Sequence, residues 1–247
     1  SPDVADPAAR NIDFDELVTN YKECIDGLLD GGSDILMLET IFDSLNAKAG
    51  IFAYLTKCTE LKKEIPFIVS GTITDASGRT LSGQTPEAFW TSLKHSNPSA
   101  IGFNCALGAE QLRPYLYSLE KISHHAISLH PNAGLPNEMG EYEESPEEMA
   151  SIIEDFCKDG LLNIVGGCCG TTPDHISAIK KVAKNYEPRR IKQGSKNTYF
   201  SGLEHLSINK ESLFINIGER TNVTGSTKFA NLIKNKQYME ALEVAKE

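Results

Sequence analysis

At 247 residues the chain is long enough for one large domain, or for one domain and part of another. Its 40% hydrophobic and 23% charged residues are typical of a globular protein, while a formal net charge of -10 without clustered lysine or arginine argues against a nucleic-acid partner. No apolar run approaches the ~20 residues that cross a bilayer, and six cysteines are too few for a secreted disulfide scaffold. We therefore expect a cytoplasmic protein with reduced or metal-bound thiols and no membrane partner.

Five short apolar runs predict buried strands, because unbroken apolar runs of this length are typical of strands covered on both faces. They cover residues 34–40, 66–73, 100–106, 126–134 and 162–170. Helical patterns lie between them. The segment 14–32 repeats apolar residues with helical spacing and ends at a glycine pair. Three more helices are predicted to begin at the cap-proline pairs Thr85-Pro86, Ser145-Pro146 and Thr172-Pro173.

Strand and helix thus alternate with a period of about 30 residues, which predicts parallel βα units. No G-x-G-x-x-G motif follows a strand, so a dinucleotide-binding sheet is disfavoured. Polar or reactive residues instead end each strand, which is typical of a TIM (β/α)8 barrel. Five units are three short of eight, so we expect the first three strands outside this chain.

Three segments follow from these patterns: a barrel part at residues 1–186, a linker at 187–212 and a second domain beginning at 213–247. The linker is polar and lacks apolar periodicity. After it, the sequence predicts a strand at 213–217, a polar loop and an amphipathic helix.

Two adjacent cysteines, Cys168 and Cys169, lie between glycine pairs at the end of the fifth apolar run. Alone they would fit core packing or a strained vicinal disulfide as well as a metal site. A third cysteine, Cys105, ends another predicted strand 63 positions earlier. In a barrel all three thiols would face one rim, where three thiolates favour zinc and leave its fourth position open. Such a zinc suits activation of a substrate thiol, and the chemistry suggested is thiol alkylation.

The motifs "GFNCALG", "HPNAGLPN" and "NIVGGCCGTTPDHI" resemble the homocysteine S-methyltransferase family, over about residues 1–190. The later "INIGERTNVTGS" is similar to the opening strand and loop of a pterin-binding barrel. This domain order, with "SGTITDASGRTLSGQT", resembles the family of cobalamin-dependent methionine synthases. The resemblance implies a second barrel, of which this chain would hold the first strand and helix.

The resemblance further implies that Cys105, Cys168 and Cys169 bind zinc and that homocysteine thiolate is the fourth ligand. Methyl transfer from methylcobalamin, recharged by 5-methyltetrahydrofolate, would then give methionine. No catalytic residue beyond the zinc-activated thiol is implied. The substrate would be bound by Glu39, Thr72 and Asn104, and the pterin by Asn222. Cobalamin would bind another domain of the parent protein, so we expect this chain alone not to form methionine.

Each of these roles has a plainer alternative. Glu39 could be a solvated strand-end acid or part of a structural ion pair. Thr72 and Asn104 could stabilise turns, and Asn222 could belong to an ordinary Asn turn. A cobalamin-independent methyltransferase using betaine or S-methylmethionine is a second hypothesis, disfavoured by residues 213–247. A third hypothesis is a structural zinc module without catalysis, which needs a fourth protein ligand such as His130 or His175.

Overall fold

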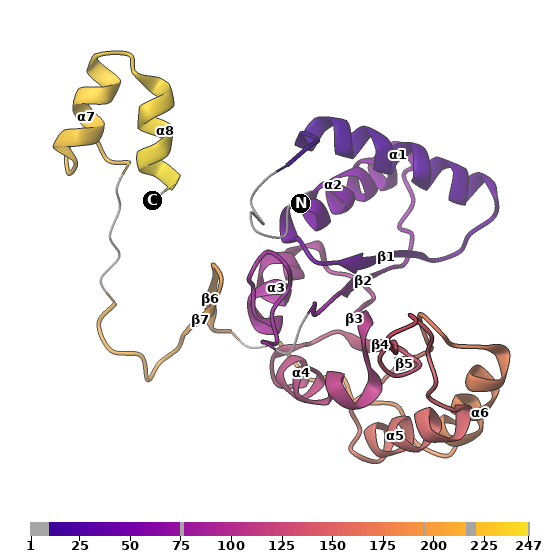
Figure 1. Ribbon diagram of the computed structural model, residues 1–247. Coiled ribbons are helices and arrows are strands. Elements are labelled where there is room, and N and C mark those ends of the chain that lie inside the picture. The colour runs from indigo at the N-terminus through magenta and orange to yellow at the C-terminus, as the bar shows by residue number, and fades with distance from the viewer. Residues whose placement is uncertain (1–9, 75–76, 195, 216–220, 247) are drawn as a thin grey trace. The chain divides into compact units, whose positions relative to one another are not determined.

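The computed structural model describes residues 10–74, 77–194, 196–215 and 221–246. It divides into two compact units, Ser1–Ser207 and Ile208–Glu247. In the first unit, five parallel strands form one sheet in chain order, with helices between them (Figure 1). The strands are β1 (Leu36–Ile41), β2 (Phe67–Gly71), β3 (Ala100–Gly108), β4 (Ala126–Asn132) and β5 (Ile164–Val165). The helices are α1 (Phe14–Asp30), α2 (Ser44–Leu61), α3 (Pro86–Leu93), α4 (Ala109–Ile122), α5 (Pro146–Lys158) and α6 (Pro173–Ala183).

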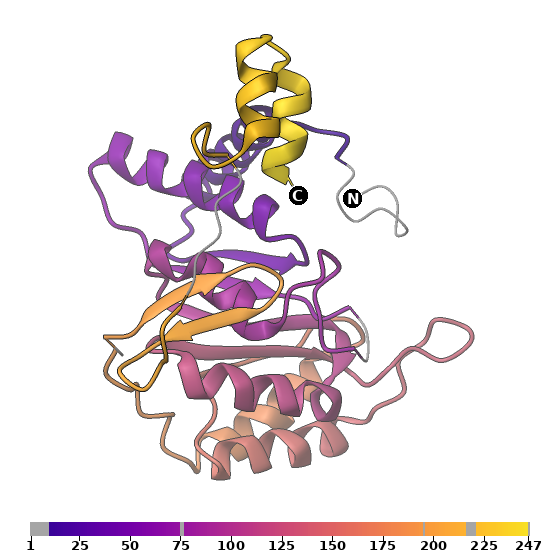
Figure 2. The same ribbon diagram turned by 90° about the vertical axis from the view of Figure 1, so that its left-hand side faces the viewer.

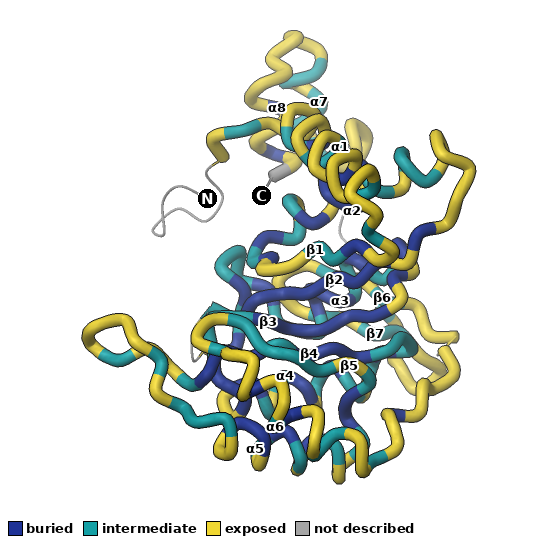
Figure 3. Tube along the Cα trace, turned by 90° about the vertical axis from the view of Figure 1, so that its right-hand side faces the viewer, coloured by how far each residue is buried: buried dark blue, intermediate teal, exposed yellow. Residues whose placement is uncertain are grey.

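The predicted strands are confirmed, and their parallel pairing is the partial barrel that the βα alternation indicated. Successive side chains of a strand point to opposite faces. On one face, large residues such as Val69, Phe103 and Leu129 join the core built with the helices. On the other face, the register aligns Ser70 with Gly102, and Gly102 with Ser128. β2 is buried along its whole length (Figure 3).

The helix starts follow the predicted caps. The Thr85 side chain accepts a hydrogen bond from the backbone of Ala88, and Pro86 occupies the first turn of α3. Ser145 forms a capping box at the start of α5, and at the start of α6 the Thr172 N–H donates to the His175 ring. These local bonds satisfy N–H groups that have no partner inside the helix, and so fix where each helix begins after its strand.

The segment expected as a linker contains a hairpin of β6 (Thr198–Ser201) and β7 (His205–Ile208). Figure 2 shows this hairpin beside α3. Ser201 bonds Ser92 and the Ala88 carbonyl at 2.9 and 2.7 Å, and His205 bonds Thr91 at 2.7 Å. Because these contacts are polar, the hairpin leaves little apolar periodicity in the sequence. The first unit therefore extends to Ser207.

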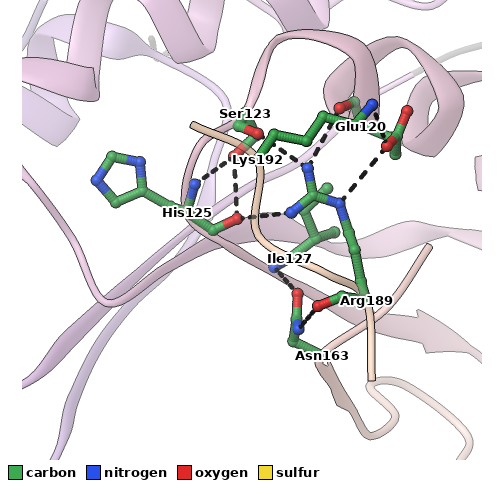
Figure 4. Close-up of polar contacts among 7 residues, drawn as sticks. All are labelled: Glu120, Ser123, His125, Ile127, Asn163, Arg189 and Lys192. Carbon is green, nitrogen blue, oxygen red and sulfur yellow. Dashed lines mark hydrogen bonds and ion pairs between the residues drawn. The ribbon is translucent and has the colours of Figure 1, made fainter. Parts of the chain in front are cut away.

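The chain after α6 is held by Arg189 at the amino-terminal end of the sheet (Figure 4). Its guanidinium is buried and donates hydrogen bonds to the carbonyls of Glu120, Ser123 and His125, at 2.9 to 3.3 Å. The Arg189 carbonyl accepts a bond from Asn163, whose oxygen accepts from the backbone of Ile127. One residue thus ties this segment to the end of α4 and to the beginning of β4.

The second unit contains α7 (Thr227–Lys234) and α8 (Tyr238–Lys246), where a single helix was expected. The helix is interrupted because Lys236 adopts a left-handed conformation. The expected strand at 213–217 is not formed at 213–215, and 216–217 lie outside the described residues. Asn222 accepts hydrogen bonds from Thr224 and Ser226, which is the geometry of an Asn turn before α7.

Replacing Arg189 by alanine is expected to reduce the free energy of unfolding by about 2–4 kcal/mol, because three carbonyls, one buried and two partly buried, lose their charged donor. Urea unfolding followed by circular dichroism measures this loss. Arg190→Ala is the matched control, since Arg190 is exposed and the change in charge is the same. Equal stability of the two variants would contradict the role given to Arg189.

Candidate metal centre

The first thiol is positioned by an irregular end of β3. The register between β3 and β4 runs in step to Asn104, which faces His130, and resumes at Gly108, which faces Asn132. The extra residues form a bulge in which Cys105 and Ala106 adopt left-handed conformations, with φ of 64° and 59°. Non-glycine residues in this conformation are uncommon, and surrounding contacts must hold them there. The bulge places the Cys105 thiol at the carboxyl end of the sheet.

The other two thiols lie in the turn that follows β5. The backbone N–H of Cys168 donates to the Pro131 carbonyl at 2.7 Å, and the Cys169 carbonyl accepts from Ala133 at 2.9 Å. The Asn132 side chain accepts from the Cys169 N–H at 3.1 Å. The turn is therefore bonded to the end of β4, the strand between it and β3. This explains how cysteines 63 positions apart come together.

The three sulfurs form one cluster. Sγ of Cys105 lies 3.6 Å from that of Cys169, which lies 4.0 Å from that of Cys168. All three lie within 4.8 Å of one another, and they are the only such group of potential ligands among the residues described. A tetrahedral zinc with bonds of about 2.3 Å to sulfur requires sulfurs about 3.8 Å apart. The cluster therefore fits zinc in both spacing and ligand type.

Neither proposed histidine joins the cluster. His175 bonds Thr172 through Nδ1 and the Glu144 carbonyl through Nε2, so both ring nitrogens are engaged. His130 is not grouped with the thiols among the described residues, and burial lowers the pKa of its imidazole. A closed site with a histidine as fourth protein ligand has no support here. Three protein ligands leave one position for an exogenous group.

The charge of Cys168 depends on metal. Burial, together with the neighbouring Cys105 and Cys169, raises the pKa of the Cys168 thiol to about 12, and a hydrogen bond from Asn104 opposes this effect. Without metal this thiol is therefore neutral near pH 7. A metal binds the thiolate, so metal binding must release the proton, and the affinity for metal rises with pH.

The predicted substrate residues lie beside the thiols on neighbouring strands. Glu39 is exposed at the end of β1, and one of its carboxylate oxygens lies 3.3 Å from the Asn104 amide nitrogen. Asn104 is fully buried, and its amide also lies 3.9 Å from the Cys168 sulfur. Thr72 donates its hydroxyl hydrogen bond to the Asn104 carbonyl at 3.0 Å. The structure thus brings all three residues together next to the cluster.

Three contacts of the site were not predicted. Asn132 accepts a hydrogen bond from the Cys169 N–H and so holds the turn of the paired cysteines. Tyr142 comes from the loop between β4 and α5, and the pKa of its phenol is raised by burial and by the nearby Cys169 thiol. Thr40 bonds Asn104 through both its backbone and its hydroxyl. Strand-end position could have indicated Thr40 and Asn132, but no local pattern marks Tyr142.

Replacing Cys105 by serine is expected to abolish stoichiometric zinc binding, or to weaken it at least tenfold, because two adjacent thiols alone leave zinc with half its ligands. Zinc content after dialysis, measured by mass spectrometry, tests this. Cys24→Ser is the matched control, because Cys24 is exposed on α1. Unchanged zinc content in the Cys105 variant would mean that the cluster is not the site.

Comparison with known proteins agrees with this geometry. The sequence matches the family described as homocysteine S-methyltransferase over residues 2–183. The fold is similar to crystal structures of the homocysteine methyltransferase MmuM from Escherichia coli. Against the apo form the TM-score is 0.52 at 20% identity, covering 69% of this chain and 57% of MmuM. Against the metallated form it is 0.54 at 20% identity, covering 71% and 54%.

The chain therefore spans little more than half the length of the solved structures that it matches. At this identity, the likeness shows a shared fold and no more. The family match is independent of it and extends over most of the chain, including all three cysteines. The protein belongs to the homocysteine S-methyltransferase family.

Proposed function

We propose that this chain binds homocysteine through its sulfur, at a zinc ion held by Cys105, Cys168 and Cys169, and so prepares that sulfur for methylation to methionine. The observation that carries the proposal is the cluster of three thiols within 4.8 Å at the open end of the sheet. Membership of the methyltransferase family supports the choice of substrate. The low identity to MmuM adds support for the fold only.

Zinc, when bound, would act as a Lewis acid that stabilises a substrate thiolate near neutral pH. The three cysteine thiolates would bind the zinc ion and leave its fourth ligand position free. Thiolate ligands donate more charge than histidines, so they disfavour water activation and preserve the nucleophilicity of a fourth sulfur. The exposed positions of Cys169 and Glu39 leave this side open to a small substrate.

The chain's other residues would orient the substrate. Glu39 is accessible and lies on the strand next but one to Cys105, so its carboxylate can bind the ammonium group of homocysteine. Thr72 and Asn104 support that arrangement from the buried side. The thiol proton leaves to solvent, and a sulfur lone pair forms the new S–C bond. The bond between the methyl group and its donor breaks, and its electron pair remains with the donor.

For the donor, we propose methylcobalamin, recharged by 5-methyltetrahydrofolate, as in cobalamin-dependent methionine synthase. The support is the sequence resemblance of the second segment to a pterin-binding barrel, with Asn222 as the candidate pterin contact. Only part of that segment is described, and it forms a separate unit. Cobalamin and the remaining steps would then require other domains as partners. Betaine or S-methylmethionine would make the second segment superfluous.

Adding homocysteine to the zinc-loaded chain is expected to raise the number of sulfurs bound to zinc from three to four. Extended X-ray absorption at the zinc edge measures this number. Methionine is the matched control ligand, because its sulfur is already methylated and carries no thiol proton. A zinc environment that stays at three sulfurs with excess homocysteine would refute the proposal.

A further inference from the structure

A single buried side chain, Asn104, connects the thiol cluster to the end of β1. Its oxygen accepts hydrogen bonds from the backbone N–H of Thr40 at 2.9 Å and from the Ser70 hydroxyl at 2.7 Å. A backbone N–H can only donate, so this end of the amide must be the oxygen. The nitrogen therefore faces Thr40 Oγ1 at 2.8 Å, Glu39 at 3.3 Å and the Cys168 sulfur at 3.9 Å.

Asn104 has no hydrogen-bonding capacity left for a substrate. Both lone pairs of its oxygen are used, and its two amide hydrogens face three acceptors. The residue is also 0% exposed. It therefore acts on the substrate through the groups that it holds.

Thr40 is in an unfavourable conformation that this network maintains. Its φ is 56°, in the left-handed region, where a β-branched side chain is a true outlier. The register of β1 against β2 is regular to Leu38 and resumes at Ile41, so Glu39 and Thr40 together face one residue of β2. Backbone strain of this kind persists only where surrounding contacts impose it. Here Thr40 is held at its backbone N–H and at its hydroxyl oxygen, and both hydrogen bonds are with Asn104.

This arrangement has a geometric consequence for Glu39. The bulge at Glu39 and Thr40 sets the direction in which the carboxylate leaves the strand. The bulge at Cys105 begins immediately after Asn104 and sets the position of a metal ligand. One amide group spans both bulges, so it fixes the carboxylate relative to the sulfurs. A substrate with a thiol at one end and an ammonium group near the other needs that separation to be constant.

We infer that Asn104 and Thr40 form a positioning pair that sets the separation between the Glu39 carboxylate and the thiol cluster, and thereby selects thiols that carry an amino group at the spacing found in homocysteine. The inference rests on the proposed function, in which metal binds the sulfur and Glu39 binds the ammonium group. It assigns Thr40 a role in specificity that its exposed position at a strand end does not suggest.

The test compares two thiols on the cobalt(II)-loaded full chain. Homocysteine and 4-mercaptobutanoate differ only in the amino group, and the sulfur-to-cobalt charge-transfer band reports the binding of either. The variant Thr40→Val keeps the branched side chain and loses the hydroxyl. It is expected to weaken homocysteine binding about tenfold and 4-mercaptobutanoate binding less than twofold. Thr40→Ser, which keeps the hydroxyl, should bind homocysteine within about twofold of the unmodified chain.

Two further variants make the result decisive. Thr40→Gly also loses the hydroxyl but tolerates a positive φ, so it folds even if the valine variant does not, and it should show the same selective loss. Thr56→Val is the matched control, because the Thr56 hydroxyl donates to the Phe52 carbonyl within its own helix, α2. Its preference for homocysteine should be unchanged.

The possible outcomes distinguish failure of the proposed function from failure of the role given to Thr40. If the unmodified chain binds neither thiol through sulfur, the proposed function fails. If it binds both equally, the role of Glu39 fails. If it prefers homocysteine and the glycine variant keeps that preference, the positioning role of Thr40 is overturned. Equal weakening of both thiols would show general damage to the metal centre, which also contradicts the inference.

Discussion

The site depends on the parallel register of β3, β4 and the turn after β5. Because parallel strands end at the same edge, residues far apart in the chain meet there, and the hydrogen bonds of Cys168 and Cys169 to the end of β4 bring their thiols to Cys105. The resulting sulfur spacing of 3.6 and 4.0 Å is that of one tetrahedral ion. The proposed metal binding, substrate orientation and reaction all depend on this convergence.

The fold separates stability from chemistry. Large apolar residues of the strands pack with the helices, and Arg189 closes the amino-terminal end with bonds to three carbonyls. At the carboxyl end, the backbone is instead irregular, with bulges after Asn104 and around Thr40. Left-handed residues such as Thr40 and Cys105 are costly, and both of these lie in the bulges. The packing of the regular part of the sheet thus offsets the conformational cost of the strained residues at the site.

Sequence reasoning predicted the parts of this structure that are encoded locally. Buried strands, the caps at Thr85 and Ser145, and the meeting of strand-end thiols all follow from short-range patterns and one topological rule. It did not predict the pairing of Asn104 with Thr40, because that contact depends on bulges in two strands separated by a third. The hairpin on α3 was missed for a related reason, since it is held by polar contacts of Ser201 and His205. Such contacts leave no periodic pattern.

The chain belongs to the homocysteine S-methyltransferase family, and the three clustered thiols are the basis of the proposal that it binds homocysteine through sulfur. The central claim is that three cysteines from two distant segments hold one ion. Anomalous diffraction at the zinc absorption edge, from crystals of the zinc-loaded chain, tests it most directly. We predict one strong peak at bonding distance from Cys105, Cys168 and Cys169 together. A peak bonded to the adjacent pair alone, with the Cys105 sulfur turned away, would contradict it.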